Sequence, residues 1–214
     1  MDAGTVGAAD FGNAGTAAVT IGTVNETSPG VFTVQATPTS TGTLILRVNA
    51  GATLSDTSGN PLNTASAIAD NTTIIVQTPY EAWSGGAAFG ADANGDGVDN
   101  GLAFLLGAAN PNDSAISLLP TVSQSGGNLT MTFSMRNLAN RGSASLNVEH
   151  SSNLGISDTW LASAAVPDVG GISPTVNGVT FNVTLGSPNN AVTATISSSE
   201  AASGKLFGRL KGNP

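Results

Sequence analysis

The fold class is decided by the stretch VFTVQATPTSTGTLILRV at residues 31–48. Apolar residues occupy every second position in two parts of it, namely Phe32, Val34, Ala36, Leu44, Leu46 and Val48. Successive side chains of a β-strand point to opposite faces, so a period of two predicts one buried and one solvated face. The stretch therefore predicts half-buried β-strands.

The same alternation continues on both sides of this stretch. It places apolar residues at Val19, Ile21, Ile74 and Val76. Turn-forming residues separate these segments, at residues 25–30 and again at residues 55–63. Short strands separated by such turns favour an antiparallel β-sandwich over a helical unit. We therefore expect residues 1–78 to form a β-sandwich.

Three segments of this region carry a family resemblance. They are VNAGA at residues 48–52, LSDTSGNPL at residues 54–62 and DNTT at residues 70–73. They are similar to the end of bacterial Ig-like repeats, which stand in tandem on large surface proteins. The resemblance covers about residues 10–78 and implies an Ig-like sandwich. Residues 1–16 are rich in Gly and Ala and do not resemble the first strands of such a repeat, so the domain is expected to lack them.

An acidic loop, DANGDGVDN, occupies residues 92–100. It places oxygen-bearing side chains at loop positions 1, 3, 5 and 9, and a glycine at position 6 lets the chain turn sharply. Calcium takes six to eight oxygen ligands at roughly 2.3–2.6 Å, and this spacing directs alternate side chains to one ion. The expected ligands are the side chains of Asp92, Asn94 and Asp96, the backbone carbonyl of Val98, and Asn100 acting through water.

Two further residues bear on this calcium prediction. Loop position 12, where an EF-hand carries a bidentate Glu, is Ala103, and Asp99 adds negative charge from outside the ligand set. Extracellular modules of this kind bind calcium at about 10⁻⁴–10⁻³ M, so the site is expected to be structural rather than a sensor. The alternative is a metal-free turn, because Asn-Gly and Asp-Gly pairs are common turn formers.

Residues 79–113, which contain this loop, are expected to form a short, partly helical connector. Tyr80 and Trp83 fall within one helical turn. Residues 102–106 are apolar or aromatic and precede Gly107, a residue type that commonly ends a helix. The calcium ion is expected to stiffen this connection.

The same region carries a second resemblance. The segments YEAW at residues 80–83 and FLLG at residues 104–107, with the acidic loop between them, resemble the connector that precedes C-terminal modules of large bacterial secreted proteins. The loop itself is similar to one half of a dockerin or of a thrombospondin type 3 repeat. A dockerin needs a second loop of this type, and the sequence contains none.

A further set of β signals covers residues 114–214. A period of two recurs at residues 129–133, and the Asn-Gly pair at residues 177–178 is typical of a two-residue hairpin turn. We therefore expect a second antiparallel β-sandwich. The segment KLFGRLK at residues 205–211 resembles the terminal module of the same secreted proteins, which implies a non-catalytic sorting or anchoring element.

The composition predicts an extracellular or cell-surface location. There is no cysteine and only 9% of the residues are charged, while Gly, Thr, Ser and Asn are abundant, as in secreted bacterial β-proteins. The net charge is −8, and residues 1–113 hold ten acidic side chains against Arg47 alone. Without a basic stripe, nucleic acid is not an expected partner. Met1 is followed by Asp2 rather than by a signal peptide, so a processed or partial piece of an exported protein is expected.

No transmembrane segment and no enzymatic activity are predicted. The longest apolar runs, such as residues 102–106, are far shorter than the roughly 20 residues that a bilayer requires. His150 is the single histidine, and its neighbour Glu149 points to the opposite strand face, so we expect His150 to be structural or solvent-facing. The aspartates of the acidic loop suit one metal ion rather than the opposing walls of a catalytic cleft.

Two kinds of partner are left for such a structural or adhesive protein. Four alternating segments are clear in residues 1–78, whereas an Ig-like sandwich normally has about seven strands. Either a strand from a neighbouring copy completes the sheet and builds filaments, or the missing strands belong to the same parent chain. The alternative is a carbohydrate-binding region of a larger secreted enzyme, with Tyr80, Trp83 and Trp160 stacking on sugar rings.

Overall fold

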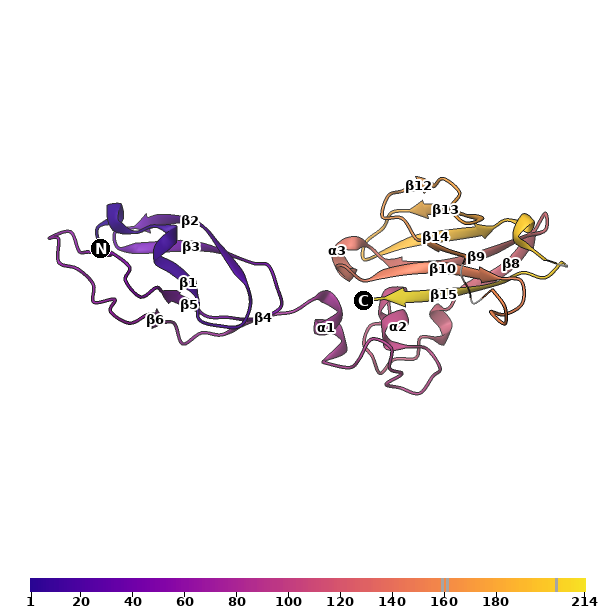
Figure 1. Ribbon diagram of the computed structural model, residues 1–214, viewed down its shortest axis with the longest axis horizontal. Coiled ribbons are helices and arrows are strands. Elements are labelled where there is room, and N and C mark those ends of the chain that lie inside the picture. Colours follow the sequence, from indigo (N-terminus) through magenta and orange to yellow (C-terminus); the bar gives the residue numbers. More distant parts are fainter. Residues whose placement is uncertain (159, 161, 203) are drawn as a thin grey trace. The chain divides into compact units, whose positions relative to one another are not determined.

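The computed structural model describes residues 1–158, 160, 162–202 and 204–214 (Figure 1). The chain is mainly β, with 40% strand and 14% helix, and the strands pair in several antiparallel sheets. This confirms the predicted predominance of antiparallel β structure. The chain separates into two compact units, Met1–Thr78 and Pro79–Pro214, which are described one at a time.

The first unit contains three small sheets. The strands pair as β2-β3, as β1-β5-β6 and as β4-β7. Their bounds are β1 Phe11–Asn13, β2 Val19–Ser28, β3 Val31–Pro38, β4 Gly42–Leu44, β5 Leu46–Val48, β6 Ile68–Ala69 and β7 Ile74–Val76, after two short 3-10 turns at Ala3–Thr5 and Ala8–Asp10. Gly30, with φ of +77°, turns the chain between β2 and β3, a backbone conformation that glycine adopts without strain.

The alternation predicted for residues 31–38 is present in β3. Phe32, Val34 and Ala36 are partly buried, whereas the residues between them are exposed. The interior of this unit is nevertheless small. Its buried apolar side chains among the described residues are those of Ala17, Leu44 and Leu54. Ile74, expected on a half-buried strand face, is 55% exposed.

The second unit contains a five-stranded sheet, in the order β12-β13-β14-β9-β8, and a three-stranded sheet, in the order β11-β10-β15. The strand bounds are β8 Thr121–Ser125, β9 Asn128–Arg136, β10 Ser145–Ser151, β11 Ala162–Ala165, β12 Gly171–Ile172, β13 Val179–Thr184, β14 Asn189–Ile196 and β15 Phe207–Asn213. Helices α1 Pro79–Ser84, α2 Asn100–Leu106 and α3 Leu138–Arg141 and 3-10 turns Ile116–Leu118 and Ser198–Glu200 complete it. None of the helices in the described residues is long and apolar enough to cross a membrane.

Both sheets of the second unit contribute to one hydrophobic core. Its members include Met131, Phe133 and Met135 of β9, Leu146 and Val148 of β10, Phe181 of β13 and Val192 of β14. The predicted hairpin turn at residues 177–178 is confirmed, since the N–H and C=O groups of Val176 and Val179 bond to each other at 2.9 Å in both directions. The predicted period of two at residues 129–133 is also present, with Met131 and Phe133 buried.

Residues 79–113 contribute side chains to the core of the second unit. Phe104, Leu105 and Leu106 of α2 are at most 1% exposed and belong to the same core as the two sheets. In Figure 1, α2 lies beside β15. A helix that is apolar on most of its circumference has to be buried on most sides, and α2 achieves this inside the second unit. The acidic loop is therefore attached directly to a packed core.

Candidate metal centre

The acidic loop is wound around the carboxylate of Asp92. Its Oδ1 accepts hydrogen bonds from the N–H groups of Gly95 at 2.9 Å and Asp96 at 3.2 Å, and its Oδ2 accepts one from Gly97 at 2.8 Å. Gly95 and Gly97 have φ of +71° and +86°, a left-handed conformation that favours glycine. The two glycines thus allow three successive parts of the loop to face one carboxylate.

A second set of contacts holds Asn94 and Asp96. Asn94 Oδ1 accepts from the N–H of Asp96 at 3.0 Å, and Asp96 Oδ1 accepts from the N–H of Val98 at 2.9 Å. Asn94 Nδ2 donates to the carbonyl of Asp113 at 2.7 Å, and Asp96 Oδ2 accepts from the N–H of Ala115 at 2.6 Å. The loop is therefore clamped to residues 113–115. This clamp joins segments that are far apart in the sequence, so the loop spacing did not predict it.

The pKa of the Asp96 carboxyl is below its ordinary value of 3.8. Loss of hydration raises this pKa, but hydrogen bonds from the N–H groups of Ala115 and Val98 and from the side chains of Ser114 and Asn94 outweigh that effect. These donors favour the ionised carboxylate. The loop therefore keeps a negative charge at Asp96 under ordinary conditions.

The lowered pKa of Asp96 predicts a contribution to acid sensitivity. A carboxyl with a depressed folded-state pKa adds stability above its unfolded pKa, and that stability is lost as the pH falls through the folded pKa. Between about pH 5 and pH 3, in the presence of chelator, the melting temperature of Asp96→Asn should therefore fall by less than that of the unmodified chain. Asp99→Asn is the matched control, because the Asp99 side chain makes no capping hydrogen bond to α2. An identical acid response in all three chains would contradict the prediction.

Val98 and Asn100, the other two predicted ligands, anchor the end of the loop. The Val98 side chain is buried in a small cluster with Ala103, Ala108 and Ala115, and no described backbone N–H donates to its carbonyl oxygen. Asn100 is 2% exposed, and its Oδ1 accepts from the N–H of Ala93 at 3.1 Å while its Nδ2 donates to a carbonyl on Ala88 at 3.0 Å. Asn100 therefore ties the loop to the preceding segment.

The chemistry of the gathered side chains fits a hard cation. Two carboxylates, one amide oxygen and one backbone carbonyl are oxygen donors of the kind that calcium prefers, and each retains lone-pair capacity beyond its hydrogen bonds. Within the described residues, no group of three or more Asp, Glu, His or Cys side chains is placed to hold a metal. Ala103 is 5% exposed and packs in the small cluster, so position 12 adds no oxygen.

Two of the aromatic side chains considered for sugar stacking pack inside the second unit. Trp83 donates its Nε1–H to the carbonyl of Ala108 at 2.8 Å, and its ring centroid lies 5.4 Å from that of Phe104. Tyr80 donates its hydroxyl to the carbonyl of Ala87 at 2.9 Å, and its ring lies 4.8 Å from that of Phe89. Tyr80 and Trp83 therefore pack, partly buried, against the core of the second unit.

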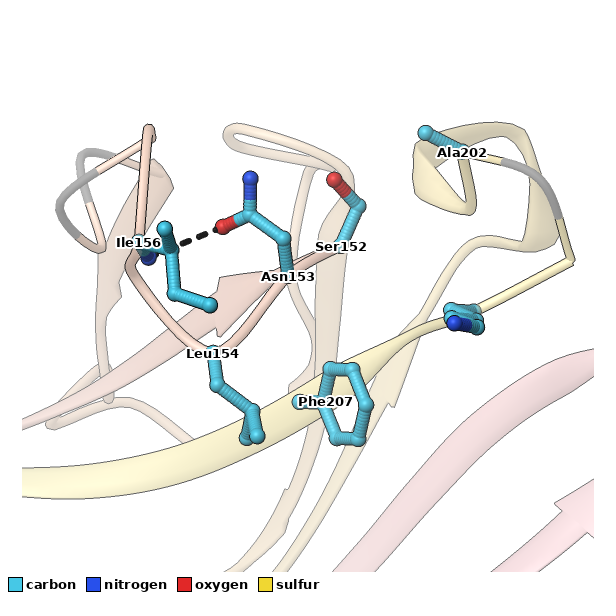
Figure 2. Close-up of a pocket in the computed structure, with 7 residues that line it drawn as sticks. Ser152, Asn153, Leu154, Ile156, Ala202 and Phe207 are labelled. Carbon is cyan, nitrogen blue, oxygen red and sulfur yellow. Dashed lines mark hydrogen bonds between the residues drawn. The ribbon is translucent and has the colours of Figure 1, made fainter.

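Trp160 has a different environment. The guanidinium carbon of Arg209 lies 4.4 Å from its ring centroid, and Arg209 in turn pairs with the carboxylate of Glu149. Trp160 also lines a cavity of about 260 Å³ with Leu154 and Phe207. A neighbouring cavity of about 470 Å³, drawn in Figure 2, is lined by Ser152, Asn153, Leu154, Ile156, Ala202, Lys205 and Phe207. Trp160 thus lies beside a cavity.

His150 is a structural residue in this arrangement. It is 4% exposed, and its Nε2 lies 2.8 Å from the carbonyl oxygen of Asn177. Glu149 points to the other face of β10, where its carboxylate meets Arg209 and Lys211. The two neighbours therefore serve separate contacts, as the alternation of side chains along a strand requires.

Comparison of the chain with protein-family models, curated proteins and solved structures finds no match. The resemblances to Ig-like repeats and to C-terminal modules of secreted proteins therefore remain predictions from the residues that carry them. A function has to be argued from the arrangement of the side chains.

Proposed function

We propose that the chain is a non-enzymatic structural or adhesive part of an extracellular or cell-surface protein, stabilised by a calcium ion in residues 92–100. The observation that carries this proposal is the direct connection of the loop to a packed core. On one side of the loop, the Asp96 carboxylate accepts a hydrogen bond from the N–H of Ala115. On the other side, α2 begins at Asn100 and carries Phe104 into the core. An ion that fixes the loop would therefore also fix the helix.

The proposed architecture is an Ig-like β-sandwich in each unit. In the second unit, this proposal is supported by two antiparallel sheets whose apolar side chains meet in one core, as in sandwich folds. The low charge content and the absence of cysteine support an exported β-protein whose stability comes from burial and hydrogen bonds. The work of such a chain is mechanical: it spaces, anchors or assembles.

Calcium is expected to raise the melting temperature of this chain. A ligand that binds only the folded form stabilises it by RT ln(1 + [L]/Kd), which is about 1.4 kcal/mol at ten times Kd. Millimolar calcium should therefore shift the midpoint upward relative to chelator. Asp92→Ala and Asp96→Ala should each abolish the shift, since each removes one of the two carboxylates.

The control for this experiment is Asp99→Ala, which removes a nearby charge and should reduce the shift only slightly. Each variant is compared with itself in chelator, because Asp92 and Asp96 also hold the loop through hydrogen bonds without metal. Superimposable melting curves in calcium and chelator for the unmodified chain would support the metal-free turn.

A second candidate, self-association by strand addition, rests on a groove in the first unit. The groove has a volume of about 350 Å³ and is lined by Val34, Ala36, Leu44, Leu46, Asp70, Thr72 and Ile74. Among the described residues, both clusters of buried apolar side chains lie in the second unit, so the first unit has little core of its own. An extended segment of a neighbouring copy would cover this groove and pair with a free strand edge.

Strand addition predicts oligomers that depend on the groove. Sedimentation at increasing protein concentration should reveal chains of copies, and Ile74→Lys should reduce them because it places a charge in the apolar lining. Ile75→Lys is the control, since Ile75 is exposed but does not line the groove. A monomer at every concentration for the unmodified chain would contradict this candidate.

The carbohydrate-binding alternative now depends on Trp160. Its position beside the cavity of about 260 Å³ is the observation that favours it. A glycan screen separates this alternative from a purely structural role. Sugar binding that is lost in Trp160→Ala would support it, whereas no binding by the unmodified chain would exclude it.

A further inference from the structure

The sequence contains three Asn-Gly pairs, at residues 94–95, 100–101 and 177–178. In such a pair, the backbone nitrogen of the glycine can attack the side-chain carbonyl carbon of the asparagine. A C–N bond forms, the C–N bond to the amide nitrogen breaks, and ammonia leaves a five-membered succinimide. Water then opens this ring to aspartate or isoaspartate. Glycine offers the least steric hindrance to the attack, because it has no side chain.

The fold blocks this reaction at two of the three pairs. The attacking N–H of Gly95 donates to Asp92 Oδ1 at 2.9 Å, and both side-chain amide atoms of Asn94 are hydrogen-bonded. The N–H of Gly101 donates to the carbonyl of Phe89 at 2.8 Å, next to an asparagine that is 2% exposed. Either nitrogen has to break a hydrogen bond before it can attack.

The third pair differs at the attacking nitrogen. Asn177 is exposed and has φ of +47°, and Gly178 has φ of +73°, which together make the hairpin turn before β13. Among the described residues, the N–H of Gly178 donates no hydrogen bond. We propose that Asn177 is the site at which the folded chain deamidates.

The modification would act on a connection between the two sheets of the second unit. The Asn177 carbonyl oxygen lies 2.8 Å from His150 Nε2 on β10, and Asn177 Nδ2 donates to the carbonyl of Ser163 on β11 at 2.6 Å. Aspartate at this position loses the Nδ2 donor and turns a carboxylate toward a carbonyl oxygen.

Peptide mapping by mass spectrometry tests the proposed site in the whole chain. The chain is incubated at mildly alkaline pH, once folded and once in denaturant. In denaturant, the three Asn-Gly pairs should convert at similar rates. In the folded chain, Asn177 should convert about tenfold faster or more than the other two, because the attacking nitrogens of Gly95 and Gly101 have to break a hydrogen bond first and that of Gly178 does not. Conversion of Asn177 as slow as that of Asn94 and Asn100 would overturn the proposal.

A variant tests the structural consequence. Asn177→Asp should lower the melting temperature by about 3–6 °C, because it removes one hydrogen bond and adds a repelled charge. Asn182→Asp is the matched control, since Asn182 is exposed on β13 and adds the same charge away from these contacts. Equal melting temperatures for the two variants would overturn the claim that the modification loosens the connection between the sheets.

Discussion

Replacing Phe104 with alanine is expected to lower the free energy of unfolding of the second unit by about 3–5 kcal/mol. Phe104 is 1% exposed and meets three different partners. Its ring lies edge-on to Tyr80, with centroids 5.4 Å apart, and 5.4 Å from the ring of Trp83. The guanidinium of Arg136 lies 4.8 Å from the same centroid and also donates to the Phe104 carbonyl. The truncation therefore leaves a cavity where α1, α2 and β9 meet.

The measurement is urea unfolding followed by tryptophan fluorescence. Both tryptophans, Trp83 and Trp160, lie in the second unit, so this signal reports on that unit. Ile116→Ala is the control, because Ile116 is 57% exposed and its truncation creates no cavity. A loss of less than about 1 kcal/mol in Phe104→Ala would mean that residues 79–113 do not belong to the core.

The packing of α2 marks the limit of what the sequence could predict here. The apolar residues at 102–106 predicted a short helix, and the helix is present at Asn100–Leu106. Five such residues are too few to show by periodicity which surface a helix covers. Its burial against both sheets depends on contacts between segments far apart in the chain, so the region was expected to be a connector.

In the acidic loop, too, local features could be predicted from the sequence and long-range contacts could not. The loop spacing alone places Asp92, Asn94 and Asp96 at alternate positions and gives Gly97 the position of the sharp turn. The clamp from Ala115 to Asp96 spans 19 residues and becomes visible only in the folded chain. The hydrogen bonds by which the buried amide of Asn100 ties two backbone segments together were also not predicted from the loop spacing.

Trp160 and Glu149 illustrate why a side chain's function was difficult to assign from its type. The sequence offered the same stacking role for both tryptophans, yet Trp83 packs against the core and Trp160 lies beside a cavity. For Glu149, the sequence predicted only that its side chain points away from that of His150. The cross-strand register that pairs Glu149 with Arg209 could not be derived, because strand order is not written in the alternation of apolar residues.

Arg209→Met is expected to cost about 2 kcal/mol, more than Glu149→Gln, although both variants remove the same ion pair. Glu149 is buried, with a side chain that is 6% exposed, whereas the Arg209 side chain is 46% exposed. Arg209 donates to Glu149 Oε2 through Nε at 2.8 Å and contacts it through Nη2 at 2.7 Å. Its removal leaves a buried carboxylate with Lys211 alone, at 3.6 Å. The exposure of Arg209 places the cost below the 3–5 kcal/mol that a fully buried pair loses.

Replacing the other partner, Glu149, costs less free energy of unfolding, because Arg209 is partly exposed to solvent. Glu149→Gln removes the buried charge and keeps a polar side chain, while the freed guanidinium of Arg209 can be hydrated, so the expected cost is about 0.5–1 kcal/mol. The double variant provides the decisive comparison in urea unfolding. It should be more stable than Arg209→Met alone, because the second substitution removes the unpaired charge that the first one creates. A double variant no more stable than Arg209→Met alone would show that Arg209 stabilises the chain through its contact with Trp160 rather than through neutralisation of Glu149. Equal costs for the two single variants would contradict the account based on an unpaired buried charge.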